Sequence, residues 1–163
     1  MNKDLQALSE SVLSACRAAR MKLATAESCT GGLVAAALTD IAGSSDVVER
    51  GFVTYSNEAK SELLGVPSAM IAAHGAVSAQ VATAMAHGAL TRAPVDLAVS
   101  ITGIAGPGGA TPGKPVGLVY FAVARKGREP RVERHTYQGD RAAVRAAATE
   151  RALELLLEAA RGR

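Results

Sequence analysis

A serine followed by two glycines is the first group of residues in this sequence that could do chemistry. Ser28 lies in residues 27–32 (ESCTGG), at a predicted strand-to-helix turn. The first N–H groups of a helix have no intrahelical acceptor, so they could stabilise an oxyanion or hold a phosphate beside the serine hydroxyl. Ser28 or Thr30 could instead be a simple N-cap, with Gly31 and Gly32 allowing close packing. The motif alone does not decide between a nucleophile and a cap.

Lys60 is the candidate base for Ser28. It follows Tyr55 by five residues across a predicted helix cap at Ser56 or Asn57, which places it in the first turn of a short helix. The helix dipole disfavours positive charge there, and an amine that loses its proton readily could accept the proton of a serine hydroxyl. Both residues also have a structural interpretation, since most lysines are solvated and most strand tyrosines only pack.

Thr102 ends an apolar stretch and opens a loop, residues 103–113, that contains five glycines and two prolines. So many helix and strand breakers exclude regular structure. A long irregular loop usually has a function, so Thr102 and the backbone of Gly103, Gly106 and Gly108 are candidates for ligand contact; the alternative is a plain surface loop. The loop matches neither G-x-G-x-x-G nor the P-loop pattern, which gives ATP hydrolysis little support.

The last predicted helix carries Arg141 and Arg145 on one face, from which either guanidinium could reach a phosphate or only form surface ion pairs. Cys29 is a competing nucleophile. No histidine lies in a recognisable cysteine-hydrolase signature, so we interpret Cys29 as a small buried residue. The three scattered histidines and two cysteines have no metal-ligand spacing, and we expect no metal and no other cofactor.

Apolar patterning predicts the elements that would position these residues. Strands are expected at residues 22–26, 50–55 and 96–102, followed by a hairpin of residues 116–125 and 131–137. Helices are expected before and between the strands, and the last two should begin at the caps Ser78 and Asp140. Alternating helices and strands with a late hairpin predict an α/β fold, a three-layer α/β/α sandwich around a mixed sheet of about five strands.

Length and composition exclude several classes of protein. The 163 residues suit one domain, residues 1–163, whose core must be filled by Ala, Val and Leu because Trp is absent and Phe and Tyr are few. A net charge of +3 and the lack of aromatic platforms argue against a nucleic-acid groove. The longest apolar runs fall short of the ~20 residues that span a bilayer. Residues 1–20 predict an amphipathic helix rather than a signal peptide, so we expect a cytoplasmic protein without membrane contact.

Taken together, four segments resemble the CinA C-terminal domain family of competence-damage-inducible proteins. They are residues 26–32 (AESCTGG), 53–57 (VTYSN) with Lys60, 75–78 (GAVS) and 100–109 (SITGIAGPGG). The resemblance covers nearly the whole chain, and the four segments occur in the same order as in the family. The chain is therefore similar to the stand-alone form of that domain. It implies an α/β/α fold. It also implies metal-free deamidation of nicotinamide mononucleotide to nicotinate mononucleotide and ammonia, in pyridine-nucleotide recycling.

Carried onto this sequence, the resemblance implies Ser28 as nucleophile, Lys60 as its base and Tyr55 as the group that orients them. Thr102 and an arginine of the last helix would contact the substrate, and of the two arginines we favour Arg145.

The oxyanion would be held by backbone N–H groups near Gly31 or in residues 103–109. Two alternatives stay open: a non-catalytic nucleotide-binding module, and a cysteine-dependent amidase that uses Cys29. A homo-oligomer is compatible with the sequence, which does not fix the number of chains.

Overall fold

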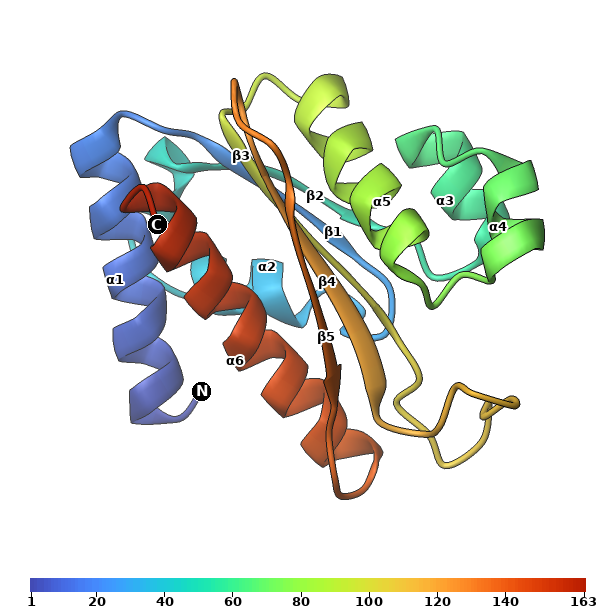
Figure 1. Ribbon diagram of the computed structural model, residues 1–163. Helices are drawn as coiled ribbons and strands as arrows, with labels where there is room; N and C mark the ends of the chain where they lie inside the picture. Colours follow the sequence, from blue (N-terminus) through green and yellow to red (C-terminus); the bar gives the residue numbers. More distant parts are fainter.

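Three layers form the protein, whose computed structural model describes residues 1–163. Two groups of helices enclose a five-stranded sheet (Figure 1). One face carries α1 (Lys3–Ala19), α2 (Leu33–Thr39) and α6 (Arg141–Ala160), and the other carries α3 (Asn57–Leu64), α4 (Ser68–His74) and α5 (Ala79–Arg92). The strands are β1 (Leu23–Glu27), β2 (Val48–Val53), β3 (Leu97–Gly103), β4 (Leu118–Arg125) and β5 (Arg131–Thr136). The predicted sandwich is confirmed.

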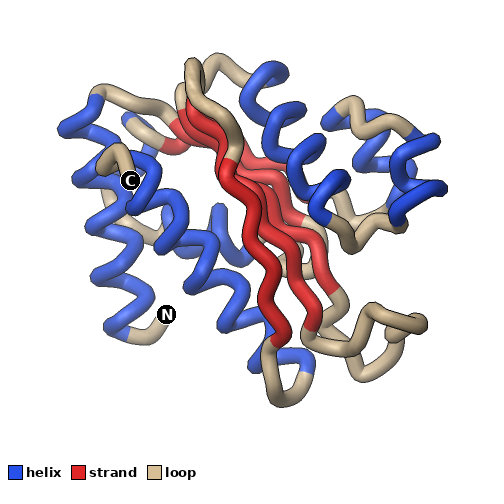
Figure 2. Tube along the Cα trace, viewed as in Figure 1, coloured by secondary structure: helices blue, strands red, loops and turns tan.

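The sheet is mixed, with the strand order β2-β1-β3-β4-β5. β1 pairs in parallel with β2 and β3, whereas β4 and β5 add an antiparallel hairpin (Figure 2). Because the three parallel strands point the same way, their carboxyl ends meet at one edge of the sheet, where α/β proteins place their ligands. The segments after these three ends are residues 28–32, 54–60 and 104–117.

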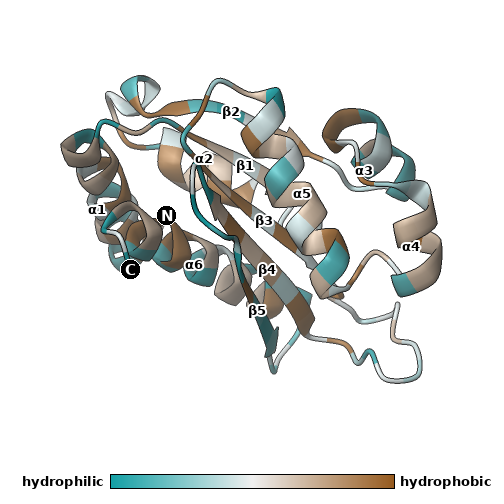
Figure 3. Ribbon diagram, turned by 45° about the horizontal axis from the view of Figure 1, so that its top comes forward, coloured by the Kyte–Doolittle hydropathy of each residue, from teal (hydrophilic) through white to brown (hydrophobic).

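Small aliphatic residues fill the space between the layers. The larger core lies between the sheet and α1, α2 and α6, and a second lies between the sheet and α5. Ala82 and Ala86 of α5 lie against Ala122 and Ala124 of β4, so helix and sheet approach closely. Figure 3 shows the apolar colour along β4 and the polar colour along β5, which is one of the two edge strands. No helix combines the length and apolar character needed to cross a bilayer.

Capping side chains set the helix boundaries where the sequence predicts them. The side chains of Ser56, Ser78 and Asp140 accept hydrogen bonds from the starts of α3, α5 and α6. Helix α4 was not predicted from the sequence. It is only seven residues long, and its N-cap residue, Pro67, makes no side-chain hydrogen bond, so neither periodicity nor a capping side chain marks it.

Gly88 lets the backbones of α3 and α5 come together. A Cβ atom built on Gly88 would lie 2.0 Å from the carbonyl oxygen of Leu64, the last residue of α3. The clash is with backbone, which cannot move aside as a flexible side chain can. The position of α3, and therefore of the residues at its start, depends on this close contact.

We expect Gly88→Ala to destabilise the protein by about 1–3 kcal/mol, the usual cost of an overpacked site. Helix propensity alone would give the opposite sign, a gain of about 1 kcal/mol. Urea unfolding measures the difference, with Gly108→Ala as the control because a Cβ there meets nothing within 4 Å. Equal or greater stability of Gly88→Ala would contradict the close contact.

Candidate active site

Ser28 is the first residue beyond β1, and its hydroxyl caps no helix. Its backbone N–H donates to Ile101 O at 2.9 Å, which extends the pairing with β3. The N-cap of α2 is Gly32, with a positive φ of 103° and no side-chain hydrogen bond. Gly31 also has a positive φ, 58°, so the turn needs both glycines for its backbone conformation. The interpretation of Ser28 or Thr30 as a simple N-cap is therefore wrong.

Lys60 points inward from α3 and contacts the serine. Its Nζ lies 3.0 Å from Ser28 Oγ, 2.9 Å from Thr54 O and 3.3 Å from Tyr55 O. Only 1% of the lysine is exposed, which contradicts the interpretation as a solvated lysine. A neutral amine in this position has two N–H groups for the carbonyls and one lone pair that can accept the hydroxyl proton of Ser28.

The environment of Lys60 changes its protonation. Burial lowers the pKa of the amine from its ordinary value of 10.5, because the charged form loses its hydration. The carbonyl oxygens around Nζ act in the opposite direction, since they stabilise the ammonium form. Lys60 is the fourth residue of α3, so burial rather than a place at the very start of the helix is the main cause of the shift.

Glu27 holds the turn from inside the sheet, and sequence reasoning gave it no role. Its carboxylate is fully buried and accepts from the N–H groups of Gly32, Val34 and Ala35 at 3.0–3.2 Å. These are N–H groups at the start of α2 that we expected to be free for an oxyanion or a phosphate. The signal in the sequence was a carboxylate at the end of an otherwise uncharged strand, just before the turn that leads into a helix.

The strand ends enclose a cavity of about 260 Å³ beside Ser28. Most of the predicted site residues line it: Ser28, Tyr55, Lys60, Thr102, Gly103, Gly106, Gly108 and Arg141. Thr102 donates its hydroxyl to Ala76 O at 2.9 Å. Asn57, Ala76 and Val77 also line the cavity; they lie in segments that carry the family resemblance, but we did not predict them as site residues.

Arg141 joins the glycine-rich loop to the segment after β2. Its guanidinium donates to Gly106 O and to the Tyr55 hydroxyl, both at 2.9 Å. The Tyr55 side chain is 62% exposed, and its hydroxyl contacts Arg141 rather than Ser28 or Lys60. Only the backbone carbonyl of Tyr55 reaches the lysine. Arg141, not Tyr55, is therefore the group that orders this side of the cavity.

Four of the predicted binding residues lie outside the cavity lining: Thr30, Gly31, Gly32 and Arg145. Thr30 is fully buried. The guanidinium of Arg145 donates to the carbonyls of Cys29 and Thr30, on the α6 side of the turn. The structure thus separates the two arginines, and Arg141, the one we did not favour, is the arginine at the cavity.

Cys29 lines the cavity but lacks the environment of a nucleophile. Burial raises the pKa of its thiol to about 11, which leaves little thiolate near neutral pH. None of the three histidines lines the cavity. No group of three His, Cys, Asp or Glu side chains is arranged to hold a metal ion.

The family model of the CinA C-terminal domain matches residues 5–160. The chain belongs to this family. The nicotinamide-nucleotide amidohydrolase PncC of Escherichia coli strain K12 is 54% identical over 155 residues, which cover 95% of this chain and 94% of that protein. A CinA-like protein of Akkermansia muciniphila is 53% identical over 141 residues, and the matched part spans only 34% of its length.

Crystal structures show the same fold in other members of the CinA family. The competence/damage inducible protein CihA from Agrobacterium tumefaciens superposes with a TM-score of 0.95 at 45% identity, over 99% of this chain and 98% of that chain. A CinA superfamily protein from Klebsiella pneumoniae gives 0.93 at 39% identity over the full length of both chains.

In this CinA domain, we expect Glu27→Gln to loosen the Ser28 turn. The amide nitrogen of glutamine would face one of the three backbone N–H groups, and an unsatisfied buried donor costs about 1–3 kcal/mol. Urea unfolding should show that loss, while the control Glu62→Gln, an exposed residue of α3, should leave stability within about 0.5 kcal/mol of wild type. Wild-type stability of Glu27→Gln would show that the carboxylate is dispensable.

Proposed function

We propose that this chain hydrolyses the carboxamide of nicotinamide mononucleotide, giving nicotinate mononucleotide and ammonia in pyridine-nucleotide recycling. The observation that carries the proposal is the buried contact of 3.0 Å between Lys60 Nζ and Ser28 Oγ at the wall of a cavity. A serine paired with a buried amine is a nucleophile with its base. The relatives named nicotinamide-nucleotide amidohydrolase support the choice of substrate.

The reaction begins when neutral Lys60 accepts the hydroxyl proton of Ser28 as Oγ attacks the carboxamide carbon. The C–O double bond becomes an oxyanion, which backbone N–H groups stabilise. When the oxyanion collapses, the ammonium group of Lys60 gives its proton to the amide nitrogen, the C–N bond breaks, and the nitrogen leaves as ammonia. Water then attacks the acyl-enzyme, with Lys60 again as the base, and releases the carboxylate and free Ser28.

The opposite side of the cavity is suited to the phosphate. Arg141 supplies a positive charge, and two of its five N–H donors serve Gly106 O and the Tyr55 hydroxyl, so three remain. In the adjacent loop, the backbone N–H groups of Ala105, Gly106, Gly108 and Gly109 donate no hydrogen bond within the chain. A guanidinium together with free N–H groups is a usual combination for binding phosphate. We therefore infer that Arg141 binds the phosphate, in place of Arg145.

The same phosphate-binding groups would also serve a nucleotide-binding module without catalysis. The two functions differ in what they require of Ser28 and Lys60. Binding alone needs no buried lysine amine, whose desolvation costs stability. Ammonia release from the mononucleotide distinguishes the two directly.

We expect Ser28→Ala to abolish ammonia release, because it removes the attacking atom. The cavity wall loses only one oxygen, so the fold should persist, as circular dichroism would show. Cys29→Ala is the matched control and should keep most of the activity. If Cys29→Ala is the inactive variant and Ser28→Ala is active, the cysteine-dependent mechanism is correct.

We expect kcat/KM to rise with pH, because only the deprotonated form of Lys60 can accept a proton. Burial lowers the pKa of the amine, so the rise should be centred below 10.5. Lys60→Arg should be almost inactive over the whole pH range, since guanidinium keeps its proton. The measurement is the pH profile of both proteins under the same conditions. Near-normal activity of Lys60→Arg would restrict Lys60 to supplying charge.

A further inference from the structure

Arg145 is half-buried on α6 and binds the turn that carries Ser28. Its Nε donates to Cys29 O at 3.1 Å and one terminal nitrogen donates to Thr30 O at 3.3 Å. Arg145 has no carboxylate within salt-bridge distance, although other arginines of the chain form seven ion pairs. Its charge is therefore directed at two backbone carbonyls.

We infer that Arg145 is a positioning residue for the oxyanion hole, which it forms by fixing and polarising the peptide unit between Cys29 and Thr30. This inference rests on the proposed function, because an oxyanion hole is needed only if Ser28 attacks a carbonyl carbon.

Peptide geometry links Arg145 to the hole. The Cys29–Thr30 peptide is trans, so its carbonyl and its N–H group point in opposite directions. Arg145 holds the carbonyl, which directs the Thr30 N–H away from the guanidinium. The N–H groups of Thr30 and of Cys29 donate to no other residue. They directly follow the nucleophile, in a turn whose other N–H groups are already used.

The remaining donors of the turn are committed to structural hydrogen bonds. Gly31 N donates to Ser28 O, Leu33 N donates to Thr30 O, and Glu27 takes the N–H groups of Gly32 and Val34. Within this turn, only the N–H groups of Cys29 and Thr30 are left to stabilise negative charge beside Ser28. A cation bound to the carbonyl of a peptide makes its N–H a stronger donor, because hydrogen bonds in series polarise one another.

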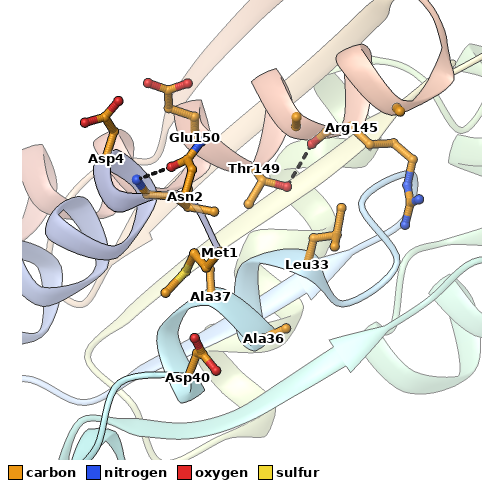
Figure 4. A pocket seen from close by; sticks show the side chains of 13 residues that line it. Met1, Asn2, Asp4, Leu33, Ala36, Ala37, Asp40, Arg145, Thr149 and Glu150 are labelled. Carbon is orange, nitrogen blue, oxygen red and sulfur yellow. Dashed lines mark hydrogen bonds between the residues drawn. The ribbon is translucent and has the colours of Figure 1, made fainter.

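The surroundings of Arg145 also separate it from the substrate cavity. It lines a groove of about 560 Å³ between the start of α1, α2 and α6, together with Leu33, Ala36 and Thr149. Figure 4 shows its side chain reaching from α6 toward the loop before α2. The cavity beside Ser28 contains Arg141 but not Arg145 in its lining. Arg145 therefore binds the turn that carries Ser28, whereas Arg141 binds Gly106 and Tyr55 at the cavity.

The test compares kcat and KM of Arg145→Gln and Arg145→Lys on nicotinamide mononucleotide and on nicotinamide riboside, which lacks the phosphate. Removing an oxyanion donor costs ~10²-fold or more, so loosening one should lower kcat on the order of tenfold with both substrates and change KM little. Arg145→Lys should recover part of the loss. A higher KM for the mononucleotide alone, with kcat unchanged, would make Arg145 the phosphate ligand and overturn the inference.

Two further measurements separate positioning from general structural support. Guanidinium chloride at low, non-denaturing concentration should restore part of the kcat of Arg145→Ala, because the ion can bind the two carbonyls; damage to the fold would not be repaired. The matched control is Arg134→Gln, at an exposed residue of β5 whose side chain makes no hydrogen bond, and it should behave as wild type. A lack of rescue together with a lower midpoint of unfolding would overturn the inference.

Acylation of Ser28 by p-nitrophenyl acetate tests the inference without the proposed substrate. Intact mass gives the acetylated fraction with time, and Arg145→Gln should slow acetylation on the order of tenfold relative to wild type. If the wild type releases no ammonia from the mononucleotide but Arg145→Gln still slows acetylation, the proposed substrate is wrong and the positioning role stands. If Ser28 is not acetylated, or is acetylated equally fast in both proteins, the positioning role is wrong.

Discussion

The buried hydrogen bond between Lys60 and Ser28 is the contact around which the site is built. An amine taken out of water is costly unless polar groups replace its hydration. Here the replacements are the Ser28 hydroxyl and backbone carbonyls of the segment between β2 and α3, so no counter-charge fixes the lysine in its protonated form. A carboxylate partner would have made Lys60 a stable ammonium and a poor base. Backbone acceptors hold the amine in place and leave its proton transferable.

Keeping that contact constrains the turn after β1 from both sides. Glu27 binds the N–H groups on the sheet side, and Arg145 binds the carbonyls on the α6 side. Two left-handed glycines, Gly31 and Gly32, let the chain reverse between these anchors. Opposite charges thus bind neighbouring peptide units of one segment, the carboxylate at N–H groups and the guanidinium at carbonyl groups. Ser28 lies at the start of the turn that Glu27 and Arg145 hold, and its hydroxyl has Lys60 as its hydrogen-bond partner.

The predicted site residues fall into two groups, those that line the cavity and those that build the turn held by Glu27 and Arg145. Those at the ends of β2 and β3, with Arg141, line the cavity, whereas Thr30, Gly31, Gly32 and Arg145 build the turn itself. A glycine-rich turn at a helix start is commonly interpreted as an anion site. In this protein the buried carboxylate of Glu27 binds the N–H groups at the start of α2. The N–H groups without an acceptor in another residue are those of Cys29 and Thr30, earlier in the same turn. In the proposed mechanism, the peptide units next to Ser28 therefore take the anion-stabilising role that we expected of the helix start.

The sequence by itself determined the layered α/β architecture, the caps of α3, α5 and α6, and the three strand ends whose residues meet around the cavity. These features depend on local patterns and on the rule that parallel strands end at one edge, so they can be derived without coordinates. Only the tertiary structure decided what Glu27, Arg141 and Arg145 do. The two arginines are one helical turn apart and equivalent in sequence, but in the folded chain one guanidinium reaches Gly106 and Tyr55 and the other reaches Cys29 and Thr30. Which partner a long side chain reaches depends on how the elements pack in three dimensions. A pattern of residue types along the sequence does not contain that information.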